Sequence, residues 1–247
     1  MVKFNSFKIK IIAFLCLTAY TVAYSGFISN TILKYSLGTI GCICIPLFAL
    51  LIDEAVDKTR SINKLMLKSL VVAIISAFPY RYVFMNKNDP GDIHLFYSLA
   101  LTSFVCLASV YMYDKMKNKF QRIFCVGFIV IITTFLIGLE LCPHALIIMF
   151  IMHICKEKKF YEKAYYITSY VAVIAVVCFV FVKMIKLDNE TYINECYQNI
   201  SLLGCIFALP IIKNYNGEKG PSCKILSYSY YTVLLVVLFI LKLTAKA

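Results

Sequence analysis

Few side chains of this sequence could do acid–base chemistry, and those few lie at the ends of long apolar stretches. Glu54 follows one such stretch, and Arg60 comes six positions later. An ionisable group at the edge of a hydrocarbon layer is costly and is by default a functional candidate. Glu54 is therefore an acid or ion-pair partner at a cytoplasmic entrance, or an interfacial charge that its neighbours solvate.

The three histidines, His94, His144 and His153, also lie near the ends of apolar stretches. A histidine base needs a second group that orients its ring. None of these stretches holds both a histidine and a carboxylate that could orient it. A solvated interfacial histidine is therefore the preferred interpretation of each, and catalysis the alternative.

Nine apolar segments must position these groups. A helix needs roughly 20 apolar residues to cross a bilayer, and most of the segments approach that length. The sequence predicts an all-α, polytopic transmembrane helical bundle with about nine membrane-spanning helices. The segments are 9–29, 32–52, 65–85, 94–113, 122–139, 141–155, 164–186, 196–213 and 225–244.

Basic residues fix the expected orientation of these segments. With a cytoplasmic N-terminus, the inner loops collect 18 of the 25 Lys and Arg residues, as the positive-inside rule requires. Segment 141–155 is the weak point, because it reaches only about 22 Å. If it does not cross, eight spans remain, and the Lys and Arg residues are shared more evenly between the two sides of the membrane.

Composition indicates one integral membrane domain over residues 1–247. The chain is 61% hydrophobic and 15% charged, which leaves too little polar surface for a soluble domain. The net charge of +12 fits loops that face anionic lipid, and no nucleic-acid partner is expected.

Most of the 11 cysteines lie within spans and should be free thiols, with a Cys142–Cys196 bridge as a minor alternative. No Cys/His spacing suits zinc, so no metal site is expected.

Two connections carry clear local signals. The mixed charges from Asp53 to Lys64 begin where a span ends and predict a short cytoplasmic continuation of the helix. Residues 86–92 on the outside, and 214–221 on the inside, are dense in turn-forming residues, with Asn216-Gly217 at the centre of the second.

With these residues in view, the chain resembles the TraX family of membrane proteins nearly from end to end. The clearest similarity is the apolar run Ile45 to Ile52, followed by Glu54, Thr59 and Arg60. Further matches occur at Phe78-Pro79 and in the loop Tyr215 to Gly220. The order and spacing of these short matches make the resemblance fairly specific.

The resemblance implies a bacterial plasma-membrane protein that transfers an acyl group. The donor would be acetyl-CoA or another acyl-CoA, and the acceptor an amine or hydroxyl of a pilin, peptide or envelope glycan. Glu54 would take part in catalysis. The phosphates of the donor would bind at Thr59, Arg60, Lys64 and Lys68.

The sequence also departs from the family pattern. Tyr20-Thr21 stands where an Asp-His pair is expected, and Cys42 and Ala77 replace an arginine and a glutamate. His94 stands in place of an asparagine. Catalysis has then either moved, with His94 as its candidate, or been lost, which would leave an accessory protein for conjugation, peptide secretion or immunity. A small transporter is a third alternative, although few mid-membrane charges support it.

Overall fold

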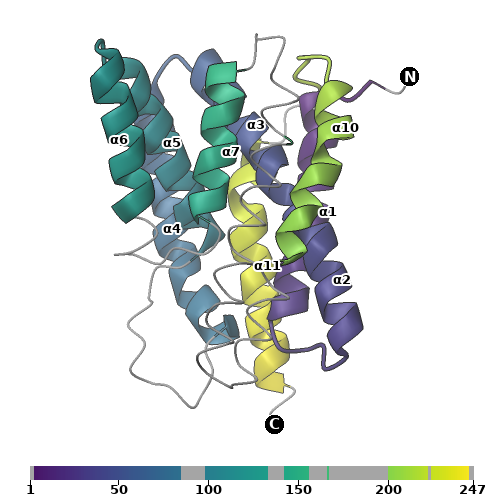
Figure 1. Cartoon of the computed structure of the whole chain (residues 1–247). Helices are drawn as coiled ribbons and strands as arrows, with labels where there is room; N and C mark the ends of the chain where they lie inside the picture. The colour runs from purple at the N-terminus through teal and green to yellow at the C-terminus, as the bar shows by residue number, and fades with distance from the viewer. Residues whose placement is uncertain are drawn as a thin grey trace, which may run out of the picture. The chain divides into compact units, whose positions relative to one another are not determined.

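The structure is a computed structural model, and the part described is all-helical (Figure 1). It describes residues 3–84, 98–132, 142–155, 166, 200–221 and 224–244. Within these ranges there is no strand, only an isolated bridge between Phe4 and Tyr215. The elements are α1 (Ser6–Tyr24), α2 (Thr31–Cys42), α3 (Cys44–Lys58), α4 (Ile62–Phe84), α5 (Leu99–Lys115), α6 (Lys119–Ile132), α7 (Cys142–Cys155), the 3-10 helix η2 (Ser201–Ala208), α10 (Leu209–Lys213) and α11 (Lys224–Thr244).

Four helices of the described part are long and apolar enough to cross a membrane. They are Ser6–Tyr24, Thr31–Lys58, Ile62–Phe84 and Ser227–Thr244. Shorter apolar helices overlap the expected segments 122–139, 141–155 and 196–213. These helices fit a membrane protein, whereas the count of about nine spans stays a prediction. Apart from Tyr166, segment 164–186 lies outside the described residues.

Local sequence explains where the first helices begin and end. The first helix ends at Tyr24 and not at residue 29, because Gly26 adopts a left-handed φ of 86°. Asn30 then caps α2 by accepting a hydrogen bond from the Leu33 amide at 3.1 Å. Beyond α2 the chain stays helical through α3 to Lys58, so the predicted continuation of the second span past Asp53 is confirmed.

The chain divides into two compact units, described separately below. The first comprises Met1–Leu47 and Ile154–Pro221, and the second Phe48–His153 and Ser222–Ala247. In the first unit α2 packs against α1 and η2. In the second α4 packs against α5 and α11, and α5 against α6.

Small residues allow the helices of the first unit to pack closely. A methyl group at position 204 would lie 1.8 Å from the carbonyl oxygen of Thr39, so only glycine fits there. A methyl group at position 41 would lie 2.6 Å from the backbone of Tyr20. Buried cysteines also lie in this region, and Cys42 and Cys205 are among those present as thiols, as predicted.

Helix ends within each unit meet as an alternating topology requires. In the first unit the start of α1 lies beside the end of α10, since the Phe4 amide donates to the Asn214 carbonyl at 2.8 Å. In the second unit Lys242, in the last turn of α11, donates to the Val83 carbonyl near the end of α4. Each pairing joins two helix ends that the predicted alternation of the segments places at the same face.

Candidate functional site

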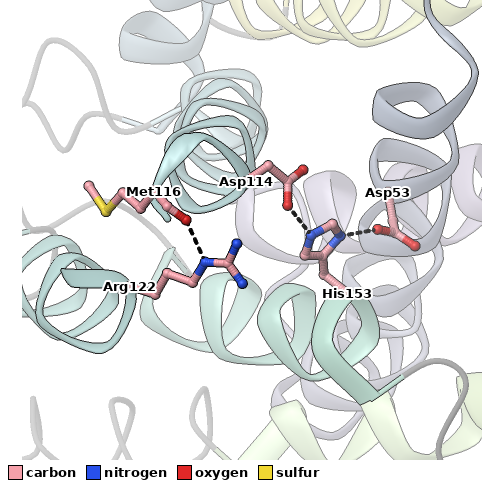
Figure 2. Close-up of polar contacts among 5 residues, drawn as sticks. All are labelled: Asp53, Asp114, Met116, Arg122 and His153. Atoms are coloured by element: carbon pink, nitrogen blue, oxygen red, sulfur yellow. Dashed lines mark hydrogen bonds and ion pairs between the residues drawn. The ribbon is translucent and has the colours of Figure 1, made fainter. Parts of the chain in front are cut away.

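A histidine between two carboxylates is the most concentrated group of titratable side chains in the described structure. Figure 2 shows the imidazole of His153 between Asp53 and Asp114. Its Nδ1 lies 2.7 Å from Oδ1 of Asp53, and its Nε2 lies 2.9 Å from Oδ1 of Asp114. Both nitrogens of one imidazole are therefore engaged by acids.

The two acids lie in different surroundings. The Asp53 side chain is only 1% exposed, whereas that of Asp114 is 45% exposed. A buried carboxylate is retained only when it is paired and hydrogen-bonded, so the Asp53 contact holds the ring in place. The exposed Asp114 can exchange its contact for water at little cost.

The two contacts of the ring also bear on its protonation. An ionised carboxylate only accepts hydrogen bonds, so with both acids ionised each ring nitrogen carries an N–H, which is the imidazolium form. His153 also lies in the last turn of α7, where the helix dipole favours a positive charge. This arrangement is the proton-loaded state of the cluster, and release of Asp114 would expose Nε2.

Aromatic and basic groups form a wall beside the histidine. The ring of Tyr113 meets that of His153 edge-on, with centroids 5.9 Å apart. The Arg122 guanidinium lies over the same tyrosine ring, 5.1 Å from its centroid. Its Nε donates to the Met116 carbonyl at 2.7 Å, which fixes the side chain in the α5–α6 turn (Figure 2). The Tyr113 ring thus contacts both the Arg122 guanidinium and the His153 imidazole.

The cluster assembles because three helices bring their C-terminal parts together. Asp53 lies in the second half of α3, Asp114 one residue before the end of α5, and His153 two residues before the end of α7. Each follows or ends an apolar run, so the helices place their first polar groups at the same level. The predicted segments 32–52, 94–113 and 141–155 therefore end at one place within this unit.

Glu54, the acid expected to be catalytic, makes a different contact from that of its neighbour Asp53. It forms an ion pair with Lys58, one turn further along α3. Its side chain is 12% exposed, but the described contacts do not place it against a histidine. The structure thus assigns the contact with His153 to the adjacent carboxylate.

The residues expected to bind donor phosphates surround the turn between α3 and α4. Thr59 is half-buried, whereas Arg60, Lys64 and Lys68 are exposed. The Lys68 ammonium also lies 5.8 Å from the centre of the Tyr228 ring. These four residues lie together in the chain and are accessible to a ligand. The other expected catalytic residue, His94, lies outside the described residues, as does the partner Cys196 of the alternative disulfide.

The positions of the family's Asp-His pair belong to the packed core of the first unit. Tyr20 and Thr21 are each 1% exposed. The Thr21 hydroxyl donates to the carbonyl of Leu17 in its own helix, at 2.7 Å. Cys42 is equally buried, and its carbonyl accepts from the Cys205 thiol at 3.4 Å. This region is filled by packing side chains.

The His153 cluster was missed because its members are far apart in the sequence. Asp53 and His153 are separated by 100 residues, and Asp114 and His153 by 39. A search for partners within one helix cannot find such pairs. The usable signal was topological, since the predicted alternation of the segments places all three residues at ends on the same face.

The comparison with protein families gives one match that spans most of the chain. The model described as "TraX protein" matches residues 6–242. Comparisons with curated proteins and with solved structures give no match. The matched range includes all members of the His153 cluster and the α3–α4 turn, and with it the resemblance seen in the sequence is confirmed: the chain belongs to the TraX family.

Proposed function

We propose that this TraX-family protein transfers an acyl group from an acyl-CoA to a nucleophile on a peptide, pilin or envelope glycan, with His153 as the base. The observation that carries the proposal is the contact between His153 Nδ1 and the buried Asp53 carboxylate at 2.7 Å. A buried acid that orients an imidazole from its rear nitrogen is the arrangement that general-base catalysis needs. It supplies the base that the first helix lacks.

The reaction requires that Asp114 leave Nε2. Its side chain is 45% exposed, so it can turn into water and give its place to the acceptor. The imidazolium first gives its Nε2 proton to water, and the neutral His153 then takes the proton of the acceptor amine or hydroxyl as that atom attacks the thioester carbonyl. The C–S bond breaks, the CoA thiolate leaves, and His153 returns the proton to the sulfur. Asp53 orients the ring throughout and stabilises its charged form.

The donor's phosphates are assigned to the α3–α4 turn. Arg60 and Lys64 are exposed there, and Arg60 lies seven residues beyond Asp53. Guanidinium and ammonium groups bind phosphate through charge-assisted hydrogen bonds. The long pantetheine arm of CoA would separate these phosphates from the thioester beside His153. On this proposal the site faces the cytoplasm of a bacterial cell, where acyl-CoA is available.

The test is label transfer from radiolabelled acetyl-CoA to a membrane fraction by the purified protein. We expect His153→Gln to lower the transfer rate by about 100-fold or more, because a positioned base contributes that much. His144→Gln is the matched control, since it removes the other described histidine of α7 and leaves the cluster intact. Equal rates for the wild type and His153→Gln would contradict the proposal.

An accessory role without catalysis is the second candidate, and a specific observation favours it. Tyr20, Thr21 and Cys42 occupy positions where the family pattern has ionisable residues, and all three are packed. A protein that neither binds acetyl-CoA nor transfers label, although it is folded, would support this role. Binding of acetyl-CoA that Arg60→Gln weakens would favour the enzyme even before an acceptor is identified.

A further inference from the structure

The first residues of the chain are joined to the loop that follows α10. The Phe4 amide donates to the Asn214 carbonyl at 2.8 Å, and the Asn216 amide to the Phe4 carbonyl at 2.9 Å. The Ser6 amide donates to the Glu218 carbonyl, also at 2.8 Å. We call this pairing of residues 3–8 with residues 213–220 the terminal clasp.

Two glycines shape the loop of the terminal clasp. Gly217 and Gly220 adopt left-handed φ values of 75° and 64°. A methyl group at position 220 would lie 2.8 Å from the amide nitrogen of the Asn5 side chain. Asn5 in turn accepts from the Lys8 amide at 2.9 Å and caps α1. The loop and the start of α1 therefore have a fixed geometry.

The terminal clasp gathers positive charge from both segments. Lys3 and Lys8 come from the N-terminal segment, Lys213 and Lys219 from the loop, and all four are exposed. The one acidic residue of the clasp is Glu218, and its carboxylate accepts from the Asn216 side-chain amide at 2.7 Å. The surface is therefore strongly cationic, and a fixed backbone holds it together.

The position of the clasp in the chain indicates the partner. Helix α1, a candidate membrane span, begins at Ser6, within the clasp. Its lysines therefore lie at the level where a bilayer carries its phosphate groups. Lysines close to an anionic membrane surface each contribute about 1 kcal/mol of attraction. A site for a free phosphate compound would have no need to coincide with the start of a span.

We propose that the terminal clasp is a binding site for the phosphate headgroup of an anionic lipid. The N-terminal segment and the loop contribute lysines to the same headgroup. Binding of the lipid then stabilises the paired form of the two segments. This inference does not depend on the proposed acyl transfer.

The experiment measures lipid retained by the purified full-length protein, by native mass spectrometry in detergent. Phosphatidylglycerol is the probe, and phosphatidylcholine is the reference. We expect the double variant Lys8→Gln/Lys219→Gln to bind phosphatidylglycerol about thirtyfold more weakly, because two attractions are lost. The matched control, Lys115→Gln/Lys117→Gln, removes the same charge from exposed positions of the other unit and should leave binding unchanged.

Other outcomes would overturn the proposal. Equal losses in the two double variants would show that only net charge matters. Displacement of phosphatidylglycerol by inorganic phosphate, but not by chloride of the same ionic strength, would show a site for free phosphate. If the glutamine variant does not fold, the lipid preference of the wild-type protein is measured at rising salt concentration instead. A preference for phosphatidylglycerol that persists at high salt would contradict electrostatic binding.

Discussion

Two regions of the chain bury polar groups in opposite ways. Around Tyr20 and Thr21 in the first unit, the hydroxyl of Thr21 is satisfied by the backbone of its own helix. Around His153 in the second unit, each contact joins side chains from different helices. The first arrangement only satisfies a polar group within α1. The second depends on the arrangement of three helices, and its groups can exchange protons.

The contrast shows where chemistry is expected. A hydroxyl that donates to a carbonyl of its own helix has no proton left to donate to a substrate. An imidazole held by a buried acid on one side, with a half-exposed acid on the other, has a contact that can be exchanged. Ionisable groups therefore mark the region in which function is expected, and small residues mark the region in which packing dominates.

Asp53→Asn should have the largest effect on activity, and it tests whether the His153 cluster is the functional region of the two. The amide keeps the shape of the side chain but removes the charge that stabilises the protonated ring. We expect label transfer to fall by about 100-fold or more. Asp57→Asn, an exposed change one turn along α3, is the matched control and should leave transfer unaltered. A full rate for Asp53→Asn would remove His153 from the proposed mechanism.

Gly204→Ala tests the packed region. The added methyl group would lie 1.8 Å from the Thr39 carbonyl oxygen and 2.8 Å from its carbon, so backbone must move. Overpacking of this kind costs about 1–3 kcal/mol. Thermal unfolding in detergent should show the loss. Gly127→Ala in α6 is the control, because a methyl group there meets no atom within 4 Å. Equal melting temperatures for the two variants would show that the packing is looser than described.

Asp114→Asn should have the smallest effect on stability and separates the two acids of the cluster. An ion pair with a half-exposed partner contributes about 0.2–1 kcal/mol. The melting temperature should therefore change little, whereas Asp53→Asn should lower it clearly. The comparison uses the same unfolding assay for both variants. A larger destabilisation by Asp114→Asn than by Asp53→Asn would reverse the assignment of the buried, orienting acid.

The helical architecture could be predicted because it follows from local properties of the sequence. Apolar runs located the described helices, and the mixed charges after Asp53 predicted that the second helix continues past this residue, as α3 does to Lys58. The end of α1 was placed five residues too late, because the hydropathy of Phe27 and Ile28 outweighed the turn at Gly26. The number of membrane crossings stays a prediction, since four candidate spans are found in the described part.

The candidate site was only partly predictable, for a physical reason. Glu54 was identified as a carboxylate at a span end, yet the residue that touches His153 is Asp53, one position earlier. Adjacent residues of a helix point about 100° apart, so hydropathy cannot decide which one faces a neighbour. The sequence did not favour His153 as a base, because its partners come from α3 and α5 and not from its own helix. Which side of one helix packs against another depends on the tertiary structure, and it cannot be read from a single sequence.

The terminal clasp has a consequence for biosynthesis. Phe4 is synthesised well before its partner Tyr215, because most of the described chain lies between the two residues. Until the loop after α10 has been made, residues 3–8 therefore lack their native backbone partners. Shortened products that end before residue 214 cannot close the clasp. Protease resistance of residues 3–8 would thus report that the loop has been made and has paired with them.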